Sequence, residues 1–296
     1  MENCTLCPRR CGVDRGNGKK GYCGESDRIR VARTSLHQWE EPCITGKYGS
    51  GTVFFSGCGL KCIFCQNHNI ADSSVGMEFT REELAEAFLR LQEKKASNIN
   101  LVTAGHFVKQ LVPVLESAKM KGLTIPVVYN TSGYETVESL RRLEGLVDIY
   151  LPDCKFYDSE TAKQYAKAPD YFQLAKDAIA EMVRQVGEPV FDEETGNMLK
   201  GVIVRHLILP GHTKDSMEII KYLHETYGDI IYISILNQYT PMGKWENFPN
   251  LNRRVTKREY EKVLGYALDL GVENAYIQEG ETADQSFIPE FDCSFI

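Results

Sequence analysis

The sequence predicts an α/β fold in which six strand–helix units form a partial (β/α)6 barrel behind a cysteine-rich N-terminal extension. Between about residues 50 and 280, short β-branched or aliphatic runs alternate with amphipathic helical patterns. Such runs are typical of parallel strands buried on both faces. Residues 1–45 are instead rich in Cys, Gly, Arg and Lys. Six units are fewer than a closed eight-stranded barrel needs, so we expect an open barrel, with a doubly wound sheet as the main alternative.

The predicted strands share a short apolar core and a polar C-terminal end. They are Thr52–Ser56, Ile99–Thr103, Ile125–Asn130, Val147–Leu151, Gly201–Leu209 and Ile230–Leu236. Right-handed crossovers would place the connecting helices outside the sheet. The C-terminal ends of all strands then lie on one face, where barrel enzymes carry their chemistry. We therefore expect two parts, an extension over residues 1–45 and a barrel with a C-terminal tail over residues 46–296.

Helix signals lie between these strands. Thr80 and Glu83 form a capping box ahead of an amphipathic stretch. A second helix is expected over Phe107–Lys121, and it ends at Gly122, a typical helix C-cap residue. We also expect a helical stretch over Ser159–Val186 broken near Pro169, a loop over Asp192–Lys200, and a last helix over Thr256–Leu270.

Composition and charge exclude several classes of protein. The 296 residues are 43% hydrophobic, and the net charge of −7 argues against a nucleic-acid partner. No apolar stretch approaches the ~20 residues of a membrane-spanning helix, and no secretory signal is present at the N-terminus. Ten cysteines in this context indicate metal ligands in a reducing compartment, so we expect a cytoplasmic protein.

Three cysteines follow the first predicted strand with the spacing Cys58-x3-Cys62-x2-Cys65. A [4Fe–4S] cluster normally takes four cysteines. Three cysteines would leave one iron open to bind a substrate or cofactor. The alternatives are a structural zinc knot or three unrelated buried cysteines, because free cysteine often packs as a small hydrophobe.

This spacing, with aromatic Phe64 before the last cysteine, resembles the signature of the radical S-adenosylmethionine (SAM) superfamily. In that family the open iron binds the amino and carboxylate groups of SAM. An electron then cleaves the sulfonium to give methionine and a 5′-deoxyadenosyl radical, which abstracts a hydrogen atom from a substrate. The resemblance implies an oxidoreductase that flavodoxin or ferredoxin reduces. It also implies an anaerobic or microaerobic setting, because oxygen damages a cluster with an exposed iron.

Polar or small residues follow the other predicted strands. They are Thr103-Ala104-Gly105-His106, Asn130-Thr131-Ser132-Gly133-Tyr134, Asp153-Cys154-Lys155, Arg205 with Pro210-Gly211, and Asn237-Gln238-Tyr239-Thr240. Because these ends lie on one face of a barrel, together they suit a single polar ligand with adenine, ribose and amino-acid parts.

The strand ends resemble those of the activating enzymes of glycyl-radical enzymes, typified by pyruvate formate-lyase activating enzyme. Asp-Thr-Asn-Gly in that group corresponds to residues 130–133 here, and Asp-Leu-Lys corresponds to residues 153–155. Its Gly-Gly-Glu, which holds the SAM amino group, is replaced by Ala104-Gly105-His106. The chain is closer to a related branch that shares the cysteine-rich start, the run at residues 237–242 and a Phe-Ile-Pro-x-Phe-Asp tail at residues 287–292.

The resemblance implies which residues form the site. Cys58, Cys62 and Cys65 would be the cluster ligands and the catalytic residues. Lys155 is expected to hold the SAM carboxylate, and His106 is the leading individual candidate for contact with SAM or substrate. The full set of implied SAM contacts is Phe64, Thr103, Ala104, Gly105, His106, Thr131, Ser132, Asp153, Lys155, Arg205 and Gln238.

The N-terminal extension carries a second set of four cysteines, Cys4-x2-Cys7-x3-Cys11-x11-Cys23. Soft thiolates select zinc or iron–sulfur clusters over hard cations. Bound metal would explain how so polar a segment folds. The sequence leaves two identities for this metal, zinc or an auxiliary iron–sulfur cluster that relays electrons. Reduced cysteines without metal are a third alternative.

The leading hypothesis is therefore a radical SAM enzyme. Its substrate could be the backbone glycine of a glycyl-radical protein, a small molecule or a modified peptide. A non-catalytic iron–sulfur electron-transfer protein is the main rival from another class, but the triplet lacks an evident fourth cysteine. A third hypothesis is a zinc-dependent hydrolase that uses His106 and Asp153, but no H-x-x-H or H-E-x-x-H pattern supports it.

Overall fold

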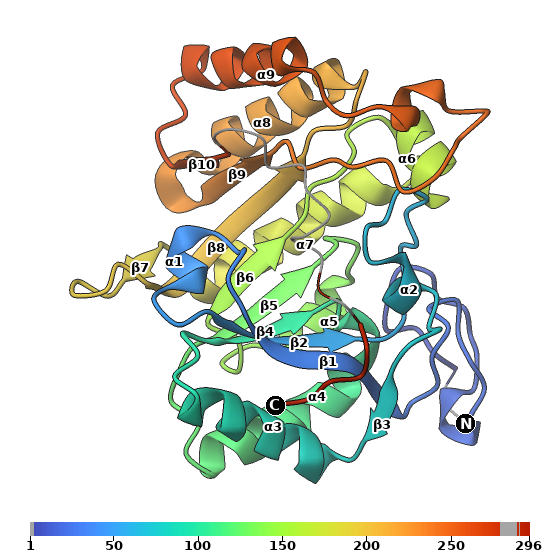
Figure 1. Cartoon of the computed structure of the whole chain (residues 1–296), viewed down its shortest axis with the longest axis vertical. Helices are drawn as coiled ribbons and strands as arrows, with labels where there is room; N and C mark the ends of the chain where they lie inside the picture. The colour runs from blue at the N-terminus through green and yellow to red at the C-terminus, as the bar shows by residue number, and fades with distance from the viewer. Residues whose placement is uncertain (1–2, 279–288, 290) are drawn as a thin grey trace.

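The computed structural model describes residues 3–278, 289 and 291–296 (Figure 1). Residues 287, 288 and 290 of the predicted tail motif lie outside this part of the chain. The sheet runs in the order β10-β9-β8-β6-β5-β4-β2-β1-β3, and β7 pairs with β8 beside it. The strands are β1 Ile29–His37, β2 Ser50–Phe55, β3 Met77–Phe79, β4 Ile99–Val102, β5 Val127–Thr131, β6 Ile149–Pro152, β7 Val190–Phe191, β8 Met198–Leu207, β9 Tyr232–Leu236 and β10 Ala275–Ile277.

The longer helices connect the strands and lie along the outside of the curved sheet (Figure 1). The helices are α1 Pro42–Thr45, α2 His68–Ala71, α3 Arg81–Glu93, α4 Val108–Met120, α5 Val137–Arg141, α6 Ser159–Ala166, α7 Tyr171–Val186, α8 Thr213–Tyr227 and α9 Lys257–Asp269. Short 3-10 helices span Arg15–Asn17, Gly105–Phe107, Gly228–Ile230 and Pro249–Asn252. Within the described residues, no helix has both the length and the apolar character needed to cross a membrane.

The predicted α/β fold with parallel strands is confirmed. β2, β4, β5, β6, β8 and β9 form the predicted parallel series, and β10 adds to β9 in the same direction. The path of strands ends at β10 on one side and at β3 on the other, so the sheet is an open barrel. The predicted break near Pro169 separates α6 from α7, and the capping boxes of α3 and α9 are both formed.

Two features differ from the expectations. β1 lies within the predicted extension of residues 1–45 but pairs antiparallel with β2 and β3, so the sheet begins before residue 46. The segment over residues 192–200 was expected to be a loop, but its last part pairs with β7 as the start of β8. In both places a segment without a clear strand pattern forms a strand because a neighbouring strand pairs with it.

Side-chain alternation along the strands separates an outer core from the barrel interior. The outer core packs strand residues such as Tyr129 and Val204 against the helices. The neighbouring residues Val128 and Ile203 face inward, where Ile44 of α1 packs against them. α1 therefore fills one part of the interior, and the remaining interior is available to the polar strand ends.

We predict that the outer core, rather than exposed helix surface, determines stability. Leu91 at the end of α3 is fully buried, whereas Leu268 at the end of α9 is 74% exposed. Leu91→Ala should lower the free energy of unfolding by about 2–5 kcal/mol. Leu268→Ala should change it by less than about 0.5 kcal/mol. Urea unfolding of the two variants makes the comparison, and similar losses would contradict the assignment of this core.

Candidate functional site

One cavity of about 380 Å³ lies in the barrel interior and reaches the loop that carries the three cysteines. Most of the side chains selected from the sequence line it: Cys58, Cys62, Phe64, Cys65, Thr103, Thr131, Ser132, Asp153, Lys155, Arg205 and Gln238. They come from a loop and five strand ends that are far apart in sequence. The parallel arrangement brings them together, as expected for the C-terminal face of such a sheet.

The cysteine loop follows β2 and is held on both sides. Gly57 has a φ of +86°, and a Cβ there would lie 2.6 Å from Cγ of Glu25, so glycine is required. The backbone nitrogen of Cys58 donates to the carbonyl of Cys23 at 3.2 Å. At the other end, Phe64 is buried with its ring edge-on to aromatic neighbours. These contacts position three thiols along one wall of the cavity.

The polar strand ends are fixed by a residue that the sequence analysis did not select. The Tyr171 hydroxyl, on α7, donates to the carbonyls of Ser132 at 2.7 Å and Asp153 at 2.9 Å. It also accepts from the backbone nitrogen of Lys155 at 3.0 Å. The Lys155 ammonium lies 2.6 Å from the Asp153 carboxylate, and this neighbour keeps the pKa of Lys155 raised despite burial. A cation therefore faces the cysteines at physiological pH.

A family model for the radical SAM superfamily matches residues 52–223. The chain belongs to this superfamily. Membership implies an enzyme that uses a [4Fe–4S] cluster and SAM, and the donor set fits that group: three soft thiols on one cavity wall, with polar strand ends around them.

Relatives place this radical SAM protein more closely. An uncharacterized protein of Methanocaldococcus jannaschii is 31% identical over 284 residues, covering 91% of this chain and 77% of the relative. The pyruvate formate-lyase-activating enzyme of Clostridium pasteurianum is 26% identical over 196 residues, covering 60% of this chain and 82% of that enzyme.

Solved structures share the fold. Methylornithine synthase aligns with a TM-score of 0.52 at 14% identity, over 74% of this chain and 60% of that one. The [FeFe]-hydrogenase maturase HydG aligns with a TM-score of 0.50 at 17% identity, over 74% of this chain and 49% of that one. This radical SAM chain thus spans less than two thirds of either structure.

Arg205 lines the cavity but is already paired. Its Nε donates to Glu41 at 2.8 Å, and its terminal nitrogen contacts both Glu40 and Glu41. Asn100 also donates to Glu40, at 3.0 Å. The two glutamates precede α1, and sequence reasoning missed them because they lie outside every recognised motif. They hold Arg205 charged and raise its pKa.

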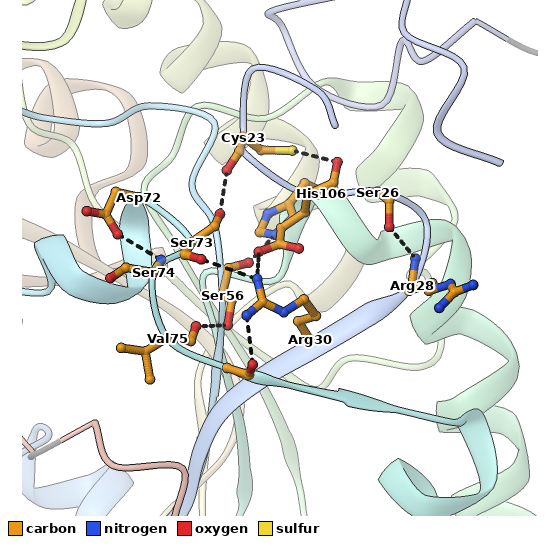
Figure 2. Close-up of polar contacts among 12 residues, drawn as sticks. Cys23, Ser26, Arg28, Arg30, Ser56, Asp72, Ser73, Ser74, Val75 and His106 are labelled. Carbon is orange, nitrogen blue, oxygen red and sulfur yellow. Dashed lines mark hydrogen bonds and ion pairs between the residues drawn. The ribbon is translucent and has the colours of Figure 1, made fainter. Parts of the chain in front are cut away.

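The Ala104-Gly105-His106 segment does not line the large cavity. The His106 ring turns toward β2, where Nε2 lies 2.7 Å from the carbonyl oxygen of Ser56 (Figure 2). Burial, and then the charge of Arg15, lower its pKa to about 3, so His106 is neutral. The Ala104 carbonyl accepts from the nitrogen of Phe107 at 2.8 Å. Contact of these residues with SAM stays a prediction, and the imidazole does not line the cavity that would hold SAM.

The cysteine-rich head, residues 4–25, packs directly against the cysteine loop. The Cys23 carbonyl accepts from the backbone nitrogen of Cys58 at 3.2 Å. It also accepts from the Ser73 hydroxyl at 3.3 Å (Figure 2). Beside this contact, Arg30 pairs with the buried carboxylate of Glu25 at 3.0 Å.

The head cysteines lie near one another. A Cβ at Gly21 would be 3.2 Å from the sulfur of Cys11 and 3.5 Å from that of Cys23. In the part of the chain that the structure describes, no three His, Cys, Asp or Glu side chains meet closely enough to hold one metal ion. Metal in the head, on Cys4, Cys7, Cys11 and Cys23, stays a prediction.

Arg9 ties the head to the loop and to the end of α6. Its guanidinium donates to Gly59 at 2.8 Å, to Leu60 at 3.2 Å and to Ala166 at 2.7 Å, and it stacks over Tyr134. The carbonyl of Ala166 is one of the unpaired groups at a helix C-terminus, where a cation is favourable.

We predict that Arg9→Ala lowers the free energy of unfolding by about 1–3 kcal/mol, because several carbonyls lose a charged donor. Hydrogen exchange of the amides over residues 58–65 should accelerate. The exposed neighbour Arg10 provides the control, since Arg10→Ala removes the same charge without these contacts. Equal effects of the two variants would show that the hydrogen bonds of Arg9 do not order the cysteine loop.

Proposed function

We propose that this protein binds a [4Fe–4S] cluster on Cys58, Cys62 and Cys65 and cleaves SAM reductively to abstract a hydrogen atom from a substrate. The observation that carries the proposal is the convergence of the three thiols with Lys155 and Asp153 around one cavity. When bound, the cluster supplies one electron to the sulfonium. Reductive cleavage of SAM would give methionine and a 5′-deoxyadenosyl radical, which would take a hydrogen atom from the substrate.

The residues of the chain would bind and orient SAM. The Lys155 ammonium would hold the SAM carboxylate, and its ion pair with Asp153 would keep it in position. Thr103, Thr131, Ser132 and Gln238 add polar groups to the lining of the same cavity. Buried aromatic rings around Phe64 exclude water from the side of the cysteine loop. Such a pocket would contribute to catalysis by aligning the radical carbon with the substrate hydrogen atom that it takes.

The similarity to the Clostridium pasteurianum activating enzyme supports a backbone glycine on a partner protein as the target hydrogen donor. The same cavity is compatible with a small molecule or a modified peptide. We propose flavodoxin or ferredoxin as the electron donor and a cytoplasmic, oxygen-poor setting, because the proposed cluster needs a low-potential reductant and is sensitive to oxygen.

The contact between Cys23 and Cys58 would put metal bound to the head next to the cysteine loop. An auxiliary iron–sulfur cluster there would lie beside the cysteine loop and could relay electrons to it. Zinc would instead stabilise the head and, through it, the loop. In either case the bound metal would help the head to fold.

We predict that Cys62→Ala removes about four iron atoms per chain after anaerobic reconstitution and abolishes release of 5′-deoxyadenosine with dithionite. Cys293→Ala, in the C-terminal tail, is the matched control and should leave both unchanged. Iron analysis and chromatography of the products make the measurement. Persistent SAM cleavage in the Cys62 variant would falsify the ligand assignment.

Metal in the head can be tested separately. Cys11→Ser should lower the metal content by about one zinc or about four iron per chain, depending on the metal bound, while the cluster of the barrel persists. Elemental analysis and the EPR spectrum of the reduced protein separate the two sites. Unchanged metal content would mean that the head cysteines are free thiols.

A further inference from the structure

The outer surface of the head carries a cluster of basic side chains. The head holds five arginines and lysines but only two acids, whereas the whole chain has a net charge of −7. Arg10, Lys19 and Lys20 are exposed to solvent. One of the two acids, Glu25, is buried and paired with Arg30. The head is therefore a positively charged region of an acidic protein.

Tyr22 connects the cations of the head with the cysteine loop. The guanidinium of Arg9 lies 4.3 Å from the centre of the Tyr22 ring, and the ammonium of Lys61 lies 5.6 Å from it. Both distances are within the range of a cation–π contact. Lys61 belongs to the cysteine loop and has a φ of +53°, in the left-handed region that favours glycine. The fold thus holds a lysine of this loop against the head in a strained backbone conformation.

The exposed cations of the head surround its exposed cysteine, Cys11. Arg10 precedes Cys11 in the sequence. A Cβ at Gly21 would lie 3.2 Å from the sulfur of Cys11, so the two lysines before Gly21 belong to a segment that packs on this cysteine. Together with the lysine of the cysteine loop, these cations form what we call the basic face, which consists of Arg10, Lys19, Lys20 and Lys61.

Within the described part of the chain, no acidic side chain forms an ion pair with the basic face. The nearby Arg28 and Arg30 do form such pairs, with acids of their own. Asp14, the second acid of the head, accepts a hydrogen bond from Asn17 at 2.6 Å. Clustered charges of one sign attract molecules of the opposite charge. The basic face therefore has unpaired charge to offer to an acidic partner.

The basic face borders the cysteine loop but not the large cavity. The head contacts this loop directly, through the hydrogen bond from the Cys58 nitrogen to the Cys23 carbonyl. The exposed side chains of Trp39 and Ile277 line the cavity, whereas no described residue of the head lines it. Figure 1 shows the head beside α2 and far from β10. A protein bound to the basic face would thus leave the mouth of the cavity open for substrate.

We propose that the basic face docks an acidic one-electron carrier protein. This inference rests on the proposed function, which requires an electron at the cysteine loop. The carrier would lose one electron to the protein, and no bond would form or break. Most of this acidic chain repels an acidic carrier, so attraction at the basic face selects an orientation that places the carrier beside the loop. Electron transfer slows steeply with distance, which makes this orientation the productive one.

The test measures equilibrium binding of a labelled acidic flavodoxin and of a labelled acidic ferredoxin to the full chain, reconstituted anaerobically. At least one carrier should bind, and its affinity should fall as the salt concentration rises, because salt screens exposed charges. Lys19→Glu combined with Lys20→Glu should weaken this binding roughly tenfold or more, because two attractions become repulsions. Fluorescence anisotropy at low and high salt makes the measurement.

Lys121→Glu combined with Lys262→Glu is the matched control. Both lysines are exposed, at the end of α4 and on α9, and neither forms an ion pair among the described residues. The control changes the net charge by the same amount at a distance from the head, so the affinity should stay within about twofold of the wild type. Cytochrome c, a basic one-electron carrier, tests the sign of the charge, and the head variant should not bind it more weakly.

Two further readouts separate docking from folding and from chemistry. Carbodiimide links a lysine ammonium to a carboxylate that it touches, so cross-links between the wild type and the carrier should map to lysines of the basic face. Dithionite is a small reductant that needs no docking surface. The ratio of carrier-driven to dithionite-driven release of 5′-deoxyadenosine should therefore fall roughly tenfold in the head variant and stay constant in the control.

The outcomes distinguish this inference from the proposed function. If the wild type releases no 5′-deoxyadenosine with dithionite, the proposed function fails and this inference with it. If dithionite works but neither carrier binds, or if the head variant and the control lose affinity equally, the docking surface alone is wrong. Cross-links confined to lysines outside the basic face would also overturn it, even if a variant does not fold. A single-stranded RNA oligonucleotide that binds the basic face more tightly than either carrier would overturn it in favour of nucleic acid.

Discussion

Part of the interior of this open barrel is polar, and the site depends on the pairing of the charges buried there. Arg205 is held by two carboxylates that precede α1, and Lys155 is held by Asp153. Removing one member of such a pair leaves an uncompensated buried charge, which destabilises strongly. These pairs therefore define the walls of the cavity. Glu135 is an exception among the described residues, because no ion pair holds its buried carboxylate and its Oε2 has no hydrogen-bond partner.

The head and the cysteine loop form one structural unit despite their separation in sequence. Backbone hydrogen bonds, Arg9 and the Glu25–Arg30 pair all connect the head to the loop or to the strands beside it. A radical SAM barrel needs its three cysteines in a defined loop, and a loop without regular secondary structure needs contacts from outside to be ordered. The head supplies the contacts that it lacks, so metal in the head would also affect the order of the loop.

Much of the fold could be predicted because periodicity is local. The parallel strands and the long helices carry patterns that depend only on their own residues. β1 was not predicted because Arg30 and Arg33 interrupt its apolar pattern, and β10 was not predicted because it has only three residues. Both strands exist because a neighbouring strand pairs with them. Glu40, Glu41 and Tyr171 were missed for the same reason, since their roles come from partners distant in sequence.

The sequence by itself determined the spacing of the cysteines, the family and the order of the polar strand ends, because each is a property of consecutive residues. Only the tertiary structure decided which of these side chains reach the cavity. His106 belongs to a strand end but turns toward Ser56, while Glu135 reaches over Gly105 to the cysteine loop. Backbone dihedrals at a strand end and the burial of each polar group set these directions, and neither can be read from spacing along the chain.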